Sequence, residues 1–207
     1  MALIHRATLT PSKLELLTSW LPTRSWFTAS PAITHVGAYR FDDPAGEVGL
    51  QGMLIQADGD VIVHVPLSYR GAPLPGADDF LLGTAEHSVL GTRWVYDASG
   101  DPVWATALAT AILAGGEQAE EVMDVDGELV PRPPTVRVHA AGSRAENVAA
   151  IETVTAHDEG ATTVVTAGSV DIVVVREIGT EVAGDARLIG SWDGTEAATL
   201  AVATVRR

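Results

Sequence analysis

The chain has 207 residues, of which 46% are hydrophobic, and its 13 basic and 27 acidic side chains give a formal net charge of -14. This balance supports a folded core in one large or two small domains and excludes a disordered chain. It also disfavours nucleic acid and membrane surfaces as partners, because both repel a negative protein.

The residue types present exclude several further kinds of site and segment. Without cysteine, the chain has no disulfide framework, zinc–thiolate site or iron–sulfur cluster. No apolar run approaches the roughly 20 residues that cross a bilayer, and the N-terminal apolar stretch is too short for a secretory signal. We therefore expect a cytoplasmic protein. Lys13 is the single lysine beside twelve arginines.

Residues 1–116 predict helices packed on an antiparallel sheet. An edge strand is expected over residues 2–8, followed by a short helix that begins near Pro11 and ends before Pro22. Asp58-Gly59 predicts a tight hairpin turn between two strands. A second helix is expected from Asp101-Pro102 to Gly115-Gly116. The expected strands cover residues 33–41, 48–56, 60–68, 80–82 and 93–96.

Residues 117–207 have a different composition and predict a small antiparallel β domain. Six acidic side chains fall between residues 117 and 128, and a stiff proline-rich joint follows at residues 131–134. The expected strands cover residues 135–140, 148–156, 162–167, 170–177 and 196–205. We therefore predict an α+β chain with domains at residues 1–116 and 117–207.

Motifs for metal binding, catalysis and phosphate binding are not found in the sequence. Residues 124–127 (DVDG) resemble part of a calcium loop, but Val122 and Pro133 occupy positions that require acids, so a hairpin turn is expected instead. The sequence has neither a Gly-x-Ser-x-Gly elbow nor a glycine-rich phosphate loop. We therefore expect no catalytic residue, no metal site and no cofactor.

One segment concentrates side chains that could form a binding or docking surface. Aromatic rings stack on sugar faces and charged groups hold hydroxyls, which favours a sugar site. The same side chains also have a purely structural interpretation. In it, Arg70 and Arg93 pair with acids such as Asp97, and the aromatic side chains pack on one face of the sheet. The candidate residues are Tyr69, Arg70, His87, Arg93, Trp94, Tyr96 and Asp97.

The order of several short segments resembles the N-terminal cap domain of actinobacterial maltokinases, which phosphorylate maltose with ATP. The matching segments, in order, are WLPTRSWF (20–27), VPLSYR (65–70), LGT (82–84), HS (87–88), LG (90–91), RWVYD (93–97) and DP (101–102). The resemblance covers about residues 1–115. It implies a cystatin-like cap, with a curved antiparallel sheet packed by helices.

The rest of the chain is similar to the start of a kinase N-lobe, in SRAENV (143–148) and VDIVVVR (170–176). In the kinases, a strand at this place carries the ATP-binding lysine, whereas Val173 stands at the expected position here. Arg176 is no simple substitute, because its guanidinium is larger and differs in geometry. The kinase catalytic loop and metal-binding Asp segment are not found, so the resemblance implies a β domain resembling an N-lobe remnant without kinase activity.

The first functional hypothesis is a non-catalytic cap-like module that docks onto or regulates an enzyme of maltose, trehalose or glycogen metabolism. The alternative is a module that binds a small molecule, either a sugar or a sugar phosphate, through the segment from Arg70 to Asp97. A stand-alone enzyme is the third hypothesis. The sequence leaves the oligomeric state open.

Overall fold

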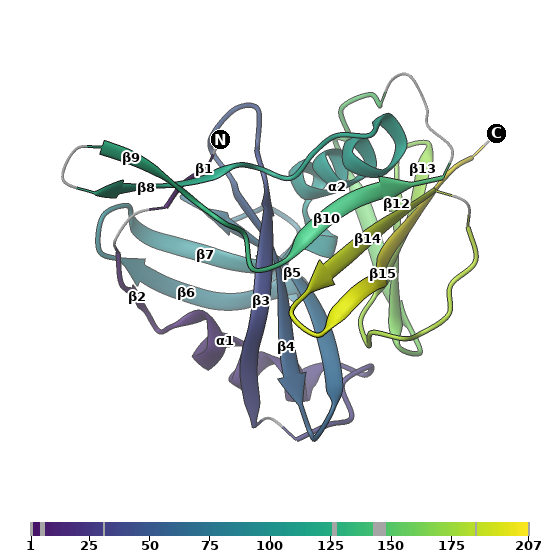
Figure 1. The fold of residues 1–207 in the computed structure, drawn as a ribbon, viewed down its shortest axis with the longest axis horizontal. Coiled ribbons are helices and arrows are strands. Elements are labelled where there is room, and N and C mark those ends of the chain that lie inside the picture. The colour runs from purple at the N-terminus through teal and green to yellow at the C-terminus, as the bar shows by residue number, and fades with distance from the viewer. Residues whose placement is uncertain are drawn as a thin grey trace.

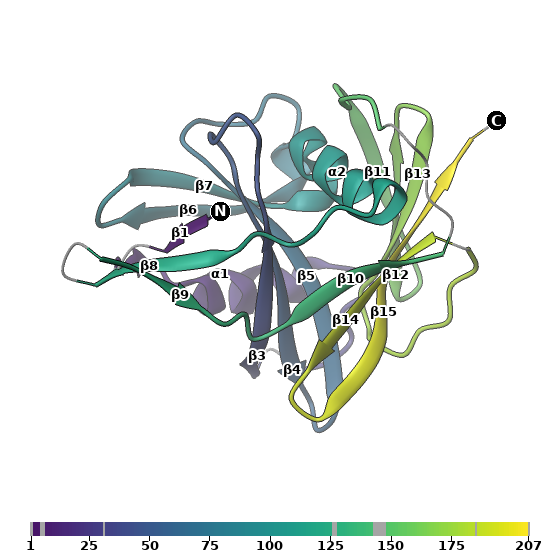
Figure 2. The same ribbon diagram turned by 45° about the horizontal axis from the view of Figure 1, so that its top comes forward.

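The structure, a computed structural model, describes residues 2–4, 7–30, 32–125, 128–142, 148–184 and 186–206. In these residues the protein is mostly antiparallel β-sheet with two short α-helices (Figure 1). Two six-stranded sheets lie side by side, and the second α-helix lies between them (Figure 2). The structure thus confirms the predicted combination of antiparallel sheets and packed helices.

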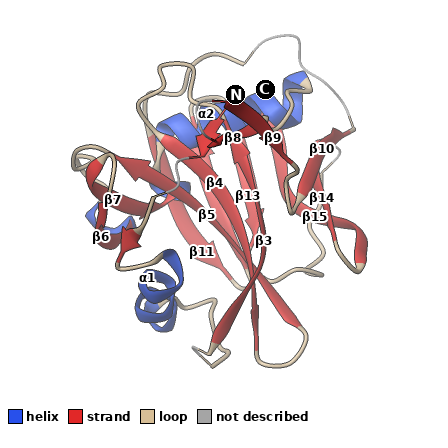
Figure 3. Ribbon diagram, turned by 60° about the vertical axis from the view of Figure 1, so that its left-hand side comes forward, coloured by secondary structure: helices blue, strands red, loops and turns tan. Residues whose placement is uncertain are grey.

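The first sheet has the strand order β2-β6-β7-β5-β4-β3 and is strongly curled (Figure 3). The hairpin predicted at Asp58-Gly59 is present: both residues have positive φ, and Ala57 pairs with Val61 across the turn. The strands are β2 (Leu9–Thr10), β3 (Ile33–Phe41), β4 (Gly49–Ala57), β5 (Val61–Arg70), β6 (Leu81–His87) and β7 (Gly91–Asp97).

Helix α1 (Lys13–Trp20) covers one face of this sheet. It begins with a capping box, in which the Ser12 hydroxyl accepts from the Glu15 N–H and the Glu15 carboxylate accepts from the Ser12 N–H. Leu17 and Trp20 are buried against the sheet face that carries Val65. Because side chains alternate along β5, its other face turns toward the second sheet. The predicted helix is confirmed, and a 3₁₀ turn, η1 (Leu21–Thr23), follows it at the expected proline.

The second six-stranded sheet has the strand order β10-β14-β15-β13-β12-β11 and is antiparallel throughout. Strand β14 was not predicted, because it is interrupted by Gly190, which packs directly against Leu200. The strands are β10 (Arg137–Ala141), β11 (Val154–Glu159), β12 (Thr162–Ala167), β13 (Val170–Val175), β14 (Ala186–Trp192) and β15 (Thr195–Val205). The 143–147 segment quoted for the kinase resemblance lies outside the described residues.

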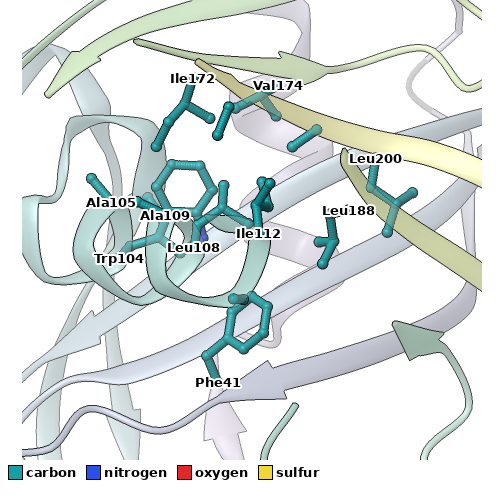
Figure 4. Close-up of a cluster of buried hydrophobic side chains, with 14 of the residues drawn as sticks. Phe41, Trp104, Ala105, Leu108, Ala109, Ile112, Ile172, Val174, Leu188 and Leu200 are labelled. Atoms are coloured by element: carbon teal, nitrogen blue, oxygen red, sulfur yellow. The ribbon is translucent and has the colours of Figure 1, made fainter. Parts of the chain in front are cut away.

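Helix α2 (Pro102–Ala109) fills the space between the two six-stranded sheets. It continues as a π-helical turn, Thr110–Ala114, and ends at Gly115, whose φ of 72° fits the predicted glycine stop. Trp104, Leu108 and Ile112 point into one cluster with Ile172 and Leu188 of the second sheet (Figure 4). Phe41 and Leu50 of the first sheet join the same cluster. The two predicted domains therefore share a hydrophobic core.

A three-stranded sheet projects from this body and is formed by β1 (Ala2–Ile4), β8 (Glu121–Val125) and β9 (Glu128–Arg132). The β8–β9 pairing is antiparallel, as the hairpin expected from the DVDG segment requires, although residues 126 and 127 at its turn lie outside the described residues. Strand β1 pairs with β8 in parallel, which the sequence did not indicate. Short 3₁₀ turns, η2 (Asp78–Phe80) and η3 (Ala98–Gly100), precede β6 and α2. No helix of the described residues is long and apolar enough to cross a membrane.

Candidate functional site

A cavity of about 950 Å³, here called the Lys13 cavity, lies where α1, the first sheet and the β8–β9 hairpin meet. This volume is at the upper end of the range typical of small-molecule sites. The polar side chains that line the cavity come mainly from α1, from strands β3 to β9 and from the loop after β3, which adds the carboxylates of Asp42, Asp43 and Glu47. They include Lys13 of α1, Arg40 of β3, Gln51 of β4, Tyr69 of β5, Glu121 of β8 and Arg132 of β9.

Lys13 is the first residue of α1, and the buried leucines of that helix hold it at the cavity. Its Nζ donates a hydrogen bond to Gln51 Oε1 at 2.6 Å. The Tyr69 hydroxyl donates to the same amide oxygen at 3.1 Å, and the Lys13 ammonium lies 5.2 Å from the centre of the Tyr69 ring. The lysine is thus fixed by neutral groups, and Gln51 Oε1 provides no full negative charge to stabilise it.

Lys13 has an unusual titration for a lysine. Burial is the main cause that lowers its pKa from 10.5 to about 7, and the neighbouring charges of Arg40 and Arg132 lower it further, whereas Glu121 opposes them. The position at a helix N-terminus also disfavours a cation. Near neutral pH a large fraction of this amine is therefore uncharged and able to act as a nucleophile.

Glu121 and Arg132 face each other across the β8–β9 hairpin and form the wall opposite Lys13. The carboxylate is buried, and its Oε2 lies 4.0 Å from Arg132 Nη1, which is a loose contact for an ion pair. The pKa of His35, also in the cavity wall, is lowered by burial and then by Lys13 and Arg132. The cavity therefore combines the cationic side chains of Lys13, Arg40, Arg93 and Arg132 with the carboxylates of Glu121, Asp42, Asp43 and Glu47.

Three of the predicted candidates, Tyr69, His87 and Arg93, line the Lys13 cavity. Arg93 also donates to the Leu90 carbonyl of its own hairpin at 2.5 Å. Strand alternation places these side chains on one side of β5, β6 and β7, so their neighbours in sequence point to the other side. The segment singled out in the sequence thus contributes to the cavity with only part of its side chains.

Arg70 and the aromatic residues of β7 lie elsewhere. Arg70 donates two hydrogen bonds of 2.7 Å to the buried carboxylate of Asp101, which also caps the start of α2 by accepting from the Val103 N–H. Trp94 is half-buried opposite Arg70 in the β5–β7 pair. The Tyr96 hydroxyl accepts from the Leu74 N–H at 2.9 Å. These contacts position the loops around α2 and lie outside the Lys13 cavity.

Asp97 belongs to a second polar group, here called the Arg176 cluster, which consists of Arg176, Asp97, Ser99 and Thr163. Arg176 is fully buried; its Nη2 donates to Asp97 Oδ2 at 2.5 Å and to Ser99 Oγ at 3.1 Å, and its Nε donates to Thr163 Oγ1 at 2.7 Å. Nη1 has no hydrogen-bond partner among the described residues, and the guanidinium lies over the ring of Trp26, 4.9 Å from its centre. Arg176 thus joins the two sheets, and its guanidinium is not open to a phosphate group.

His64 extends this contact between the sheets. Its Nδ1 lies 3.2 Å from the Val175 carbonyl, and its Nε2 lies 2.9 Å from the Tyr39 hydroxyl. Because a carbonyl only accepts, Nδ1 carries the proton and Nε2 accepts from Tyr39. Burial, followed by the charge of Arg176, lowers the pKa of His64 to about 3. This histidine is therefore a neutral structural residue.

Sequence reasoning did not propose Lys13, Arg40, Gln51, Glu121 or Arg132 as site residues, although all of them line the Lys13 cavity. One indication of this site was present in the sequence: Lys13 is the only lysine, and a residue type that occurs once is a candidate for a special role. Among the described residues, no group of three or more His, Asp or Glu side chains could hold a metal ion.

The fold and site thus define an antiparallel β protein with a polar cavity beside its first sheet. Residues 20–101 match the family model of the maltokinase N-terminal cap domain. The match confirms, for this segment, the resemblance seen in the sequence. A search of curated proteins gives no match. Lys13, Glu121 and Arg132 lie outside the matched segment, so the Lys13 cavity is built jointly by the matched segment and residues on either side of it.

Proposed function

We propose that this protein is a non-catalytic, cap-like module that binds a small anionic carbohydrate, of the sugar-phosphate class, in the Lys13 cavity. The observation that carries the proposal is the placement of the only lysine, half-buried, in a cavity of about 950 Å³ that Arg40 and Arg132 also line. Buried charges in proteins are ordinarily paired. The charges that act on Lys13 are those of two arginines and one carboxylate, Glu121, so an anionic ligand would add negative charge beside the three cations; Asp42, Asp43 and Glu47 also line the cavity.

The neutral polar groups of the cavity are suited to bind the sugar part of such a ligand. Gln51 and the Tyr69 hydroxyl offer hydrogen-bonding atoms beside the cations. Sugar hydroxyls are recognised by such groups, whereas a phosphate is recognised by arginine and lysine. The overall charge of -14 adds a condition: the local cations must attract the anion against the field of the whole protein.

Calorimetric titration with glucose 1-phosphate, glucose and inorganic phosphate tests this proposal. We expect glucose 1-phosphate to bind more tightly than either of its parts, and Lys13→Met to weaken binding by at least about tenfold, since a charge-assisted contact contributes roughly 1.5–3 kcal/mol. Arg137→Gln is the matched control, because Arg137 is exposed on β10 and does not line the Lys13 cavity. Equal effects of the two substitutions, or no binding of any anion, would refute the proposal.

A second candidate function is docking onto an enzyme of maltose, trehalose or glycogen metabolism. The match of residues 20–101 to a maltokinase cap domain favours it, because a cap is an accessory to another catalytic unit. Exposed apolar side chains offer a contact surface: Val89 and Leu90 at the β6–β7 turn, and Leu129 and Val130 on β9. Leu90 also lines the Lys13 cavity, so docking there could respond to a bound ligand.

Affinity capture from the native cytosol, followed by mass spectrometry, tests the docking hypothesis. We expect enrichment of a glucan- or trehalose-pathway enzyme, and loss of that enrichment when Leu90 and Leu129 are replaced by Ser. Val205→Ser is the control, because this exposed apolar side chain lies at the end of β15. Enrichment that persists in the Leu90/Leu129 variant would place docking on another surface, and enrichment of no such enzyme would contradict the hypothesis.

We also propose that the first sheet corresponds to the cystatin-like cap, that the second corresponds to a kinase N-lobe remnant, and that the protein acts in the cytoplasm. The cap match supports the first part. For the second part, Val173 stands at the expected lysine position and the Arg176 guanidinium is enclosed by protein. We expect ATP with Mg²⁺ to leave the melting temperature unchanged, and a saturable increase would contradict a remnant without nucleotide affinity.

A further inference from the structure

We propose that Lys13 captures the aldehyde of an anionic ligand as an imine, so that the Lys13 cavity holds open-chain aldose phosphates or related phosphorylated aldehydes covalently and reversibly. This inference rests on the proposed anion site, and it adds a reaction to it. It assigns to Lys13 a role as nucleophile rather than only as a charge.

The geometry of the cavity favours attack by Nζ on a bound carbonyl. Lys13 projects from the rigid first turn of α1 into a space large enough for a phosphorylated sugar. Gln51 Oε1 holds Nζ in one position by accepting from it at 2.6 Å, and the Tyr69 ring lies beneath the amine. Arg40 and Arg132 are available to hold the phosphate, so the carbonyl end of the ligand can lie at Lys13.

The same surroundings make the amine reactive. An ordinary lysine is almost wholly protonated at neutral pH, and its ammonium has no lone pair for attack. Burial together with the neighbouring arginine charges lowers the pKa of Lys13 to about 7. Desolvation and nearby cations are the two features that activate lysines for imine formation in proteins.

The reaction balances without any further reagent. The Nζ lone pair forms a bond to the carbonyl carbon, and the carbonyl π bond breaks to give an oxyanion, which takes up the proton that nitrogen loses. The resulting carbinolamine loses its hydroxyl group as water while a C=N bond forms. Amine and aldehyde are thus converted into imine and water, with no net oxidation. The Tyr69 hydroxyl and Lys13 Nζ both donate to Gln51 Oε1, so this hydroxyl is a fixed proton donor beside the amine.

The single lysine makes this inference easy to test. Apart from the N-terminal amine, Lys13 is the only primary amine in the chain. The probe is pyridoxal 5′-phosphate, an anionic aldehyde, followed by borohydride reduction and peptide mapping. We expect Lys13 to be labelled at least about tenfold faster than the N-terminal amine, and faster by pyridoxal 5′-phosphate than by phosphate-free pyridoxal. Glucose 1-phosphate, which cannot open to an aldehyde, should slow the labelling by competition.

Two variants separate the imine from the anion site on which it rests. Lys13→Arg keeps the positive charge, so it should retain binding of glucose 1-phosphate but lose all labelling at position 13. Arg40→Gln should reduce labelling by the phosphorylated aldehyde more strongly than the slower reaction with pyridoxal, because the pyridoxal reaction responds only to the raised pKa of Lys13. Circular dichroism of each variant establishes that the fold is intact.

Three results would overturn the proposal. Labelling shared equally between Lys13 and the N-terminal amine would show that the cavity gives no activation. Labelling of Lys13 that is insensitive to glucose 1-phosphate would separate the amine from the anion site. Binding of glucose 1-phosphate without any labelling of Lys13 would refute the imine and leave the proposed anion site standing, whereas no anion binding at all would refute both.

Discussion

Two cations of this protein, the fully buried Arg176 and the half-buried Lys13, have contrasting surroundings. Arg176 lies between the two sheets and donates three hydrogen bonds, one of them to the carboxylate of Asp97 at 2.5 Å. Lys13 has the neutral amide of Gln51 as its hydrogen-bond acceptor, and its pKa is lowered first by desolvation and then by the charges of two arginines. The protein thus compensates the first cation well and the second poorly.

This difference separates a structural residue from a candidate functional one. A buried charge without full compensation is costly, so it persists where the uncompensated state serves a purpose. The compensated Arg176 connects segments far apart in the chain, and its replacement should affect the fold. Replacement of the poorly compensated Lys13 should instead change ligand binding and the pH dependence of stability, and it could even stabilise the fold.

The largest expected effect is the loss of stability in Arg176→Met. The substitution leaves the buried carboxylate of Asp97 without its cation, which typically costs about 3–5 kcal/mol. Urea denaturation at pH 7 measures the change, and Asp97→Asn in the same background tests whether the two losses overlap. Two full, additive losses would show that Arg176 and Asp97 do not act as one pair.

A smaller loss is expected for the partly exposed pair between Arg70 and Asp101. Asp101→Asn removes the charge that accepts both Arg70 hydrogen bonds but keeps a side chain able to cap α2. Since hydrogen bonds to charged groups contribute roughly 1.5–3 kcal/mol, we expect a loss of about 2 kcal/mol in the free energy of unfolding. A loss as large as that of Arg176→Met would mean that burial of the cation does not set the cost.

Lys13→Met should change the pH dependence of stability. Below about pH 7 the lysine is protonated in both folded and unfolded states, whereas between pH 7 and 10.5 only the unfolded chain binds the proton. Stability of the unmodified protein therefore rises with pH across this window, by about 1–2 kcal/mol between pH 7 and 8.5. The variant should lack this rise and be more stable at pH 7. A rise that persists in Lys13→Met would assign it to another group.

The sequence predicted local features well and distant partners poorly. Asp58-Gly59 fixes its own hairpin, because the turn needs two residues that tolerate positive φ. Gly115 ends the α2 segment for a similar local reason. In contrast, the partner of Asp97 is Arg176, 79 residues away, and no local pattern encodes that pair. Strand β14 was missed because its Gly190 breaks an otherwise strand-like pattern.

The candidate site was likewise only partly predictable from the sequence. Tyr69, His87 and Arg93 were predicted as site residues and do line the Lys13 cavity. Alternation along β5 turned Arg70 to the other face, where it meets Asp101. The remaining polar wall comes from strands β3, β4, β8 and β9, which converge only when the first sheet curls and the acidic hairpin folds over it. The juxtaposition depends on tertiary structure, and a linear motif could not reveal it.

The smallest expected effect is on the pKa of Lys13 itself, and it tests how the neighbouring charges act. A single lysine labelled with ¹³C at Cε gives one NMR resonance, whose shift with pH reports its titration directly. We expect Arg40→Gln to raise the pKa more than Arg132→Gln, and Glu121→Gln to lower it, following the order and sign of the neighbouring charges. Each change should be below about one pKa unit, or roughly 1.4 kcal/mol, because burial is the larger cause. If all three variants left the titration unchanged, burial alone would account for the neutral amine, and the two arginines would lie too far from Lys13 to hold an anion together with it.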